Sequence, residues 1–188
     1  MTERNHQFLL VGLGNPGVKY ADTRHNAGFL VLDKLVADYG GHWDSQGKVQ
    51  GILGKVTIEG SSFICLKPQT FMNRSGISVR ATVDYYKIPE DRIIVLFDDM
   101  DVPAQKVKCR KGGGHGGHNG IRSLIDHGGL KEFYRIKLGL GRPPQEWDPA
   151  DWLLSKLSQE ETQALLGPMV PEVLLRLQQI LDQNSKKV

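Results

Sequence analysis

The sequence predicts a single α/β domain built on a twisted, mostly parallel mixed sheet flanked by helices. Short apolar runs with the length of strands alternate with segments whose apolar residues recur at helical spacing. The 188 residues contain no internal repeat and no linker, and they suffice for one domain with a substantial core. This alternation is typical of α/β folds, so residues 1–188 are predicted to form one domain.

The expected elements of the N-terminal half are a buried strand at 7–12, an amphipathic helix at 27–39, strands at 48–58 and 61–67, and a second helix at 70–87. Asp22 or Thr23 could cap the first helix, and Gly40–Gly41 is expected to end it. The pair Glu59–Gly60 fits a turn between two strands. The resulting hairpin would supply the antiparallel part of the sheet.

The expected elements of the C-terminal half are strands at 92–97, 106–111 and 133–140, a short helix at 118–127, and helices after Ser158. The run 92–97 is solidly apolar, as a central strand covered on both faces would be. Ser158 and Glu161 fit a capping box. Three residues are expected to break the chain before a last helix that ends near Asn184: Gly167, Pro168 and Pro171.

Composition narrows the class of protein. No apolar run approaches the roughly 20 residues needed to cross a bilayer, and the opening "MTERNHQ" lacks the apolar segment of a signal peptide. The two cysteines, Cys65 and Cys109, give neither a disulfide framework nor metal-ligand spacing. We therefore expect a cytoplasmic protein in a reducing compartment.

Charge is unevenly distributed along the chain. Residues 106–142 carry nine Lys or Arg and two Asp or Glu, whereas the rest of the chain carries 15 and 19. A basic segment on a mildly acidic body suggests a phosphate-rich partner. The alternative is an ordinary solvated charged face.

The stretch "LLVGLGNPG" fits the dinucleotide fingerprint G-x-G-x-x-G but lacks its context. Pro16 has no N–H to offer a phosphate, the helical period begins only near Ala27, and no acidic residue ends a second strand about 20 positions later. We interpret the motif as a tight turn that exposes Asn15 at the carboxyl end of a strand. In open α/β sheets ligands bind at that edge.

A histidine and a group of carboxylates could meet at the same edge. His25 lies near the start of the first helix, and Asp98, Asp99 and Asp101 follow the apolar strand at 92–97. If the two strands run parallel, Asp98 and Asn15 emerge at one rim. A carboxylate that accepts from an imidazole fixes its tautomer and raises its basicity, which suits activation of water. The spacing is equally compatible with a polar turn before Pro103.

The stretch "KGGGHGGHNG" at 111–120 has a permissive backbone but is not a Walker loop, because no Gly-Lys-Ser/Thr follows. His115 and His118 have no Cys or carboxylate nearby in the sequence, so a structural use is favoured over a metal site. Asn119 could cap a helix or use its amide to donate and accept at once.

Asn73, within "KPQTFMNRSG", is the third asparagine to follow a glycine or proline turn, after Asn15 and Asn119. Side-chain amides pair well with peptide N–H and C=O groups, so the three predict a peptide-containing substrate. Met72 could belong to the core or contact that substrate.

Five motifs in order resemble the bacterial-type peptidyl-tRNA hydrolase family across residues 11–143: "VGLGNPGVKYADTRHNAGF", "KPQTFMNRSG", "FDDMD", "KGGGHGGHNGIRS" and "FYRIKLGLGRP". The resemblance implies hydrolysis of the ester between a peptide and the 3′-terminal ribose of tRNA. It also implies a monomeric, cofactor-free and metal-free enzyme that recycles tRNA and supports ribosome rescue.

The resemblance also implies roles for individual residues. His25 would be the catalytic base, Asp98 its partner, and Asn15 a catalytic residue that contacts substrate. The implied contacts to peptide and tRNA are Tyr20, Phe71, Met72, Asn73, Asn119, Lys108 and Arg110. Either Arg135 or Lys137 would fill a further basic position.

Strand alternation would place Lys106, Lys108 and Arg110 on one face, where they would bind phosphates. The choice of oxyanion-stabilising asparagine stays open, and the last helices could cover the peptide groove.

Two other functions are compatible with parts of the sequence. A catalytically inactive RNA-binding relative, similar to an organellar splicing factor, would use the basic face alone. The intact set of His25, Asp98 and asparagines argues against it, as does the absence of a transit peptide. A nucleotide-binding oxidoreductase would use "GLGNPG", whose context is unfavourable for the reasons given.

Overall fold

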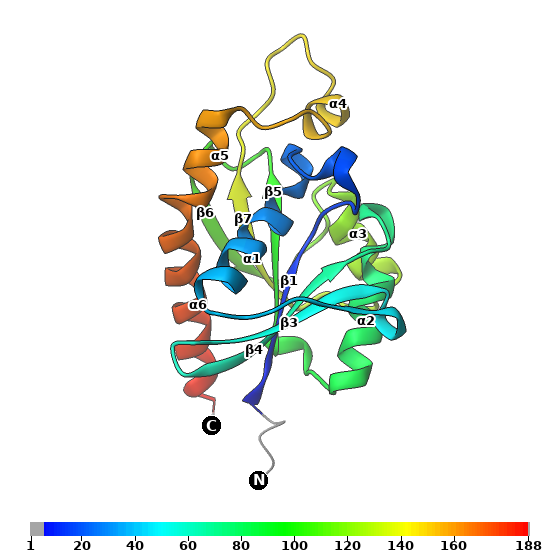
Figure 1. The fold of residues 1–188 in the computed structure, drawn as a ribbon, viewed down its shortest axis with the longest axis vertical. Coiled ribbons are helices and arrows are strands. Elements are labelled where there is room, and N and C mark those ends of the chain that lie inside the picture. Colours follow the sequence, from blue (N-terminus) through cyan, green and yellow to red (C-terminus); the bar gives the residue numbers. More distant parts are fainter. Residues whose placement is uncertain (1–5, 188) are drawn as a thin grey trace.

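The structure is a computed structural model that describes residues 6–187. Its centre is a seven-stranded mixed sheet in the order β2-β3-β4-β1-β5-β7-β6, with β4, β1, β5 and β7 parallel (Figure 1). The strands are β1 (Phe8–Gly12), β2 (Asp44–Gln46), β3 (Gly51–Ile58), β4 (Ser61–Pro68), β5 (Ile93–Asp99), β6 (Val107–Lys111) and β7 (Tyr134–Gly139). The predicted α/β class with a mostly parallel core is confirmed.

Helices cover both faces of the sheet. They are α1 (Ala27–Asp38), α2 (Ser75–Tyr86), α3 (Asn119–Asp126), α4 (Pro149–Leu153), α5 (Gln159–Leu166) and α6 (Met169–Ser185). Phe8 and Leu10 of β1 pack in the cluster with α1, α5 and α6, whereas Leu9 and Val11 pack in the cluster with α2 and α3. This alternation explains why the central strands are apolar throughout. Within residues 6–187 no helix has the length and apolarity of a membrane span.

The region before α2 differs from the prediction at two places. The strand expected from residue 48 begins at Gly51, because a 3₁₀ turn at Gly47–Val49 separates it from the unpredicted short strand β2. The helix expected from residue 70 begins at Ser75, because Phe71 has a positive φ and Met72–Arg74 form a 3₁₀ turn. The turn at Glu59–Gly60 joins β3 to β4 as expected, with both residues left-handed.

The tail contains one helix that the sequence pattern did not predict and one break that does not occur. Helix α4 is a single turn capped by Asp148, too short to show a period. Pro171 lies in the first turn of α6 and does not interrupt it, because the first N–H groups of a helix have no intrahelical acceptor. The capping box of Ser158 and Glu161 is present as predicted.

The first two glycines of "GLGNPG", Gly12 and Gly14, allow α1 to pack closely against the segment that contains them. A Cβ on Gly12 would lie 2.5 Å from the carbonyl oxygen of Gly28, and a Cβ on Gly28 would lie 2.4 Å from that of Leu96. The start of α1 therefore rests directly on the carboxyl ends of β1 and β5. This contact fixes the segment just before α1, which carries His25, against the end of β5.

Candidate active site

Most of the predicted site residues meet at the carboxyl edge of β1 and β5. A cavity of about 250 Å³ is lined by Asn15, His25, Met72, Asn73, Asn119, Ala150, Leu153 and Leu154. Its polar residues come from the segments after β1 and β4, from the turn before α1 and from the start of α3, and its apolar wall comes from α4, which extends beyond the strand ends (Figure 1). A carboxyl-edge site is what the parallel pairing of β1 with β5 requires.

His25 and Asp98 form the buried pair expected from the sequence. Nδ1 of His25 lies 2.8 Å from Oδ2 of Asp98, and the two side chains are 10% and 1% exposed. An ionised carboxylate only accepts, so Nδ1 donates. The imidazole is therefore held in the tautomer that leaves Nε2 free to accept a proton.

His118 makes a second contact with the same carboxylate. Its Nε2 lies 3.0 Å from Oδ1 of Asp98, while its Nδ1 accepts from the backbone N–H groups of Gly120 and Ile121. Nδ1 thus carries no proton and Nε2 donates to Asp98. No carboxylate lies near His118 in the sequence, but β5 brings Asp98 to it from 20 residues away. His118, rather than Asn119, is the N-cap of α3.

His25, Asp98 and His118 offer ligand atoms within 4.8 Å of one another, a set of types that binds transition metals. Hydrogen bonds from both imidazoles to Asp98 explain why the three side chains lie together, without a metal ion. Because Nδ1 of His118 accepts two backbone N–H groups, its Nε2 holds a proton and has no lone pair for a metal.

The contact between His25 and Asp98 raises the pKa of His25 and lowers the pKa of Asp98, and both shifts favour the charged forms. Burial lowers the pKa of His25, but the charge and hydrogen bond of Asp98 raise it by more, to above its ordinary 6.5. Burial raises the pKa of Asp98, but its interactions with His25 and His118 outweigh burial and hold that pKa well below its usual range. Asp98 is therefore ionised at neutral pH, and His25 is a stronger base than a free imidazole.

Asn15 is fixed at both its backbone and its side chain. Its N–H donates to Oδ1 of Asn26 at 2.8 Å, and its carbonyl accepts from Nδ2 of Asn26 at 2.9 Å. Its own Oδ1 accepts from the N–H of Met72 at 2.7 Å. The Nδ2 group is thus left as the donor that Asn15 offers to a ligand in the cavity.

Phe71 holds a strained backbone beside this contact, with φ 66° and ψ 157°. That region is nearly restricted to glycine, and such residues cost on the order of 1–3 kcal/mol each. The strained turn leads directly into Met72, whose N–H faces Asn15. The Phe71 side chain is 51% exposed and lies edge-on to Tyr20, with ring centroids 6.4 Å apart. The two predicted contact residues therefore form one aromatic pair, in which Phe71 is exposed and Tyr20 is half-buried.

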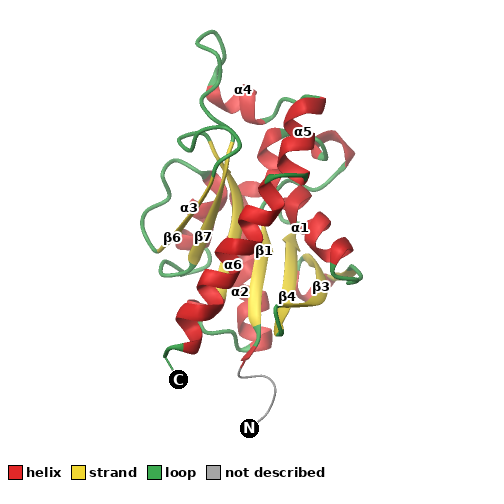
Figure 2. Ribbon diagram, turned by 90° about the vertical axis from the view of Figure 1, so that its left-hand side faces the viewer, coloured by secondary structure: helices red, strands yellow, loops and turns green. Residues whose placement is uncertain are grey.

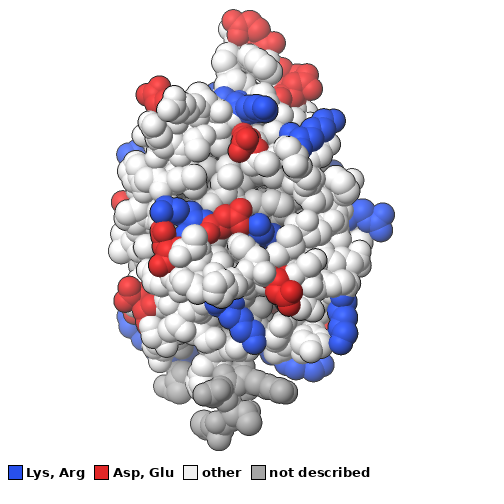
Figure 3. All heavy atoms as spheres, in the orientation of Figure 1, with Lys and Arg blue, Asp and Glu red and all other residues white. Residues whose placement is uncertain are grey.

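The predicted basic face is formed by β6 and β7. Lys108 and Arg110 are exposed on β6 and pair in register with Lys137 and Arg135 of β7, so the four cations lie on one face. Lys106 lies one residue before β6, which begins at Val107. Among the described residues drawn in Figure 3, basic and acidic side chains are interspersed on the face shown, with no single-sign patch.

Arg135 and Lys137 differ in their surroundings. Arg135 is 3% exposed, and its guanidinium donates to the carbonyls of Gly113, at 2.6 Å, and Gly114. Burial and the nearby Arg110 lower its pKa. Lys137 is partly exposed, and its Nζ lies 3.6 Å from Oδ2 of Asp99. Arg135 therefore supports the glycine loop, and Lys137 is the more accessible cation.

A second cavity of about 450 Å³ adjoins the first. It is lined by basic side chains, the acidic turn after β5, the glycine loop and Leu153, which lines both cavities. The four cations that line it are Arg110, Arg135, Lys137 and Arg142. His25 and Asp98 thus lie between an asparagine-rich cavity and a cavity lined by four cations, an arrangement suited to a substrate that is part peptide and part polyanion.

The sequence model of the family described as peptidyl-tRNA hydrolase matches residues 9–188. The chain belongs to this family. A relative from Lachnospira eligens is 47% identical over 154 residues, 82% of each chain. One from Geobacillus thermodenitrificans is 42% identical over 171 residues, 89% of this chain and 87% of the relative. A crystal structure of peptidyl-tRNA hydrolase from Acinetobacter baumannii has a TM-score of 0.85 at 34% identity, covering all of this chain and 93% of that one.

Membership in the peptidyl-tRNA hydrolase family gives the activity: the enzyme is a carboxylic ester hydrolase that splits peptidyl-tRNA into tRNA and peptide. The predicted family, fold and activity are confirmed. Sequence reasoning missed Asn26, which positions Asn15, and the contact of His118 with Asp98. Both residues adjoin predicted site residues in the sequence, and that adjacency was the only available signal.

Proposed function

We propose that His25 is the general base of the hydrolysis and that Asp98 orients and charges it for that role. The hydrogen bond from His25 Nδ1 to Asp98 carries this assignment, because it leaves Nε2 as the basic nitrogen in a residue that lines the cavity. Nε2 takes a proton from water as the water oxygen attacks the ester carbonyl carbon. The bond from that carbon to the ribose oxygen then breaks, and the imidazolium returns its proton to the leaving oxygen.

Asn15 is the favoured donor to the oxyanion. Its Oδ1 is already held by Met72, and its backbone by Asn26, so its Nδ2 group needs little reorganisation during the reaction. Such preorganised donors stabilise developing charge most effectively. Asn73 and Asn119 line the same cavity with exposed amides and are proposed to bind the peptide backbone. Met72, Tyr20 and Phe71 supply apolar contact area beside them.

Lys108, Arg110 and Lys137 are proposed to bind phosphates of the tRNA. Their shared face on β6 and β7 supports this, as does the cationic cavity next to the catalytic pair. Lys137 is preferred to Arg135, whose donors are engaged by the glycine loop.

The enzyme is further proposed to act as a monomer in the cytoplasm. There it would recycle tRNA by cleaving the peptidyl-tRNA that stalled ribosomes release. His25 and all three asparagines line one cavity of a single chain, and Asp98 of the same chain bonds to His25, which supports monomeric action. Light scattering during size-exclusion chromatography tests it, and activity confined to a larger species would contradict it.

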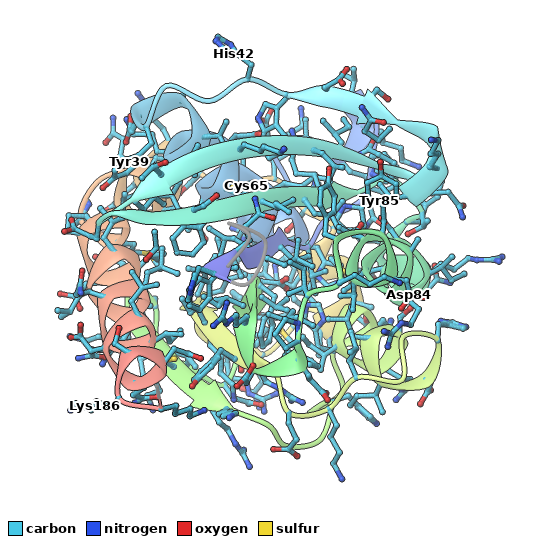
Figure 4. All side chains as sticks on the ribbon, turned by 90° about the horizontal axis from the view of Figure 1, so that it is seen from below. Tyr39, His42, Cys65, Asp84, Tyr85 and Lys186 are labelled. Atoms are coloured by element: carbon cyan, nitrogen blue, oxygen red, sulfur yellow. The ribbon has the colours of Figure 1, made fainter. Side chains whose placement is uncertain are left out.

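The assignment of His25 is tested with N-acetylaminoacyl-tRNA as substrate. Substituting His25→Ala is expected to lower kcat by about 10²- to 10⁴-fold, the usual contribution of a general base, with the Kd for tRNA unchanged. His42→Ala is the matched control, since His42 is exposed and points away from the body of the protein (Figure 4). RNA binding by the wild-type protein without ester cleavage would support the binding-protein alternative. A chelator is expected to leave the rate unchanged.

A further inference from the structure

We propose that Arg24 is a positioning residue that holds the α4 wall, residues 149–154, against the peptide side of the catalytic cavity. The proposal rests on the proposed function, which places the peptide in that cavity. Arg24 directly precedes His25, so the segment that carries the base would also hold the wall opposite it.

The α4 wall has little support of its own. Helix α4 is five residues long and contains no fully buried residue. One helical turn is unstable in isolation, because nucleation is unfavourable and few hydrogen bonds follow it. Figure 2 shows α4 beyond the end of the sheet. Its position must therefore depend on contacts with other segments.

Arg24 supplies the most extensive of these contacts. Its guanidinium lies 3.5 Å from the centre of the Trp152 ring. Nη1 donates to Oγ of Ser155 at 2.6 Å and to the carbonyl of Lys156 at 2.9 Å. Nε and Nη2 donate to the two carboxylate oxygens of Glu161 at 3.2 and 2.6 Å. One buried side chain thus ties together α4, the segment after it and α5.

The position of the Trp152 ring depends on Arg24. Its indole N–H is buried and has no hydrogen-bond partner among the described residues. The ring is therefore held by the cation above it and by Trp147, whose ring centroid lies 5.3 Å away. Backbone hydrogen bonds from Arg24 to Ser155 and from Leu157 to Asp22 hold the base of the wall. Within α4 itself, Trp152 is the residue that the Arg24 side chain contacts.

The wall determines the shape of the peptide side of the cavity. Ala150, Leu153 and Leu154 line it together with Asn15, Asn73 and Asn119. A peptide whose backbone pairs with the asparagines would place its side chains against the apolar wall. A displaced wall should thus weaken peptide binding while leaving His25 and Asp98 paired, because neither contacts α4 through a hydrogen bond.

The test compares two variants with a matched control. Arg24→Lys keeps the charge but loses the planar fork and the stack on Trp152. Glu161→Gln removes one charge and preserves the capping box, which accepts Gln as well as Glu. The control Asp84→Asn breaks an exposed ion pair with Arg80 on the outer side of α2 (Figure 4). Steady-state hydrolysis of N-acetyldipeptidyl-tRNA and hydrogen exchange of residues 152–157 are measured for each.

Arg24→Lys is expected to raise KM about tenfold, equivalent to about 1.4 kcal/mol, with kcat changed less than about twofold and faster exchange at 152–157. Glu161→Gln is expected to raise KM about threefold, within the range of partly exposed ion pairs. The pH below which kcat/KM falls, which reports the pKa of His25, should be the same in both variants as in the wild type. Should Arg24→Lys fail to fold, Glu161→Gln carries the test.

Three results would overturn the proposal. Faster exchange with unchanged KM would show that the wall does not contact the peptide. A lower kcat with a shifted acid limb would show that Arg24 acts through His25 instead. Unchanged exchange would show that α4 is held by other contacts. None of these coincides with failure of the proposed function, which full activity of His25→Ala would reveal.

Discussion

Asp98 accepts hydrogen bonds from two imidazoles that reach it from different elements. His25 precedes α1, and His118 caps α3, so the carboxylate joins segments on both sides of β5. Only the His25 imidazole keeps a free ring nitrogen, because Nδ1 of His118 is engaged by backbone N–H groups. One carboxylate therefore contacts the proposed base on one side and, on the other, a neutral imidazole that caps α3.

The pH profile tests the pairing of His25 with Asp98. His25 acts as a base only when neutral, and its pKa is raised, so the acid limb of kcat/KM is expected above pH 6.5. Asp98→Asn removes the charge that raises this pKa and leaves the burial that lowers it. The limb should move to lower pH, while kcat falls by about 10²- to 10⁴-fold because the correct tautomer is no longer held.

The measurement is kcat/KM between pH 5 and 9 for both proteins. Asp99→Asn is the matched control, because Asp99 follows Asp98 in β5 and interacts with Lys137 rather than with His25. An acid limb that stays in place in Asp98→Asn would contradict the role assigned to the carboxylate.

Site residues could be predicted from the sequence where strand ends determine their position. Asn15 and Asp98 follow apolar strands, and parallel pairing of β1 with β5 places both at one edge. The role of His118 could not be predicted in this way, because it depends on how a glycine-rich loop folds back onto β5. Asn26 was missed because its pairing with the Asn15 backbone is a tertiary contact across 11 residues.

At the scale of elements, the seating of α1 on the sheet positions the base. Gly28→Ala would place a Cβ 2.4 Å from the carbonyl of Leu96 and 2.7 Å from the backbone nitrogen of Leu13, so α1 must move away from β5. Overpacking of this kind costs about 1–3 kcal/mol. We expect a lower melting temperature and a reduced kcat, because the shift of α1 would separate His25 from Asp98.

Gly47→Ala is the matched control for this prediction, because a Cβ on Gly47 has no neighbour within 4 Å. Thermal unfolding and hydrolysis are compared for the two variants. A Gly28→Ala protein with wild-type melting temperature and kcat would show that the close contact is not needed.

Elements with a long, regular pattern could be predicted, and those fixed by tertiary contacts could not. The central strands and α1 carry continuous apolar runs or a clear period, and they match closely. Helix α4 has one turn and no buried face, and its position depends on Arg24, so no local pattern predicts it. The late start of α2 follows from the positive φ of Phe71, a conformation that no aromatic residue prefers.

At the scale of the whole molecule, four cations line one cavity beside the glycine loop: Arg110, Arg135, Lys137 and Arg142. The sequence indicated this through the excess of Lys and Arg at 106–142. It could not separate Arg135 from Lys137, because both alternate onto the same face of β7 and only burial distinguishes them. The same face pairs like charges across β6 and β7, which is unfavourable. Of the four cations paired in this way, Lys137 has the carboxylate of Asp99 3.6 Å away, which offsets part of the repulsion.

The tRNA proposed to bind at this face would reduce the remaining repulsion, and salt should compete with it. We expect log Kd for tRNA to depend linearly on log salt concentration. Lys108→Ala combined with Arg110→Ala should weaken binding and reduce the slope by about 2, since each cation that binds a phosphate accounts for about 1, with kcat at saturating substrate unchanged. Lys34→Ala with Lys48→Ala removes the same charge from exposed positions outside the basic face. Equal slopes for the two double variants would mean that tRNA binds elsewhere on the protein.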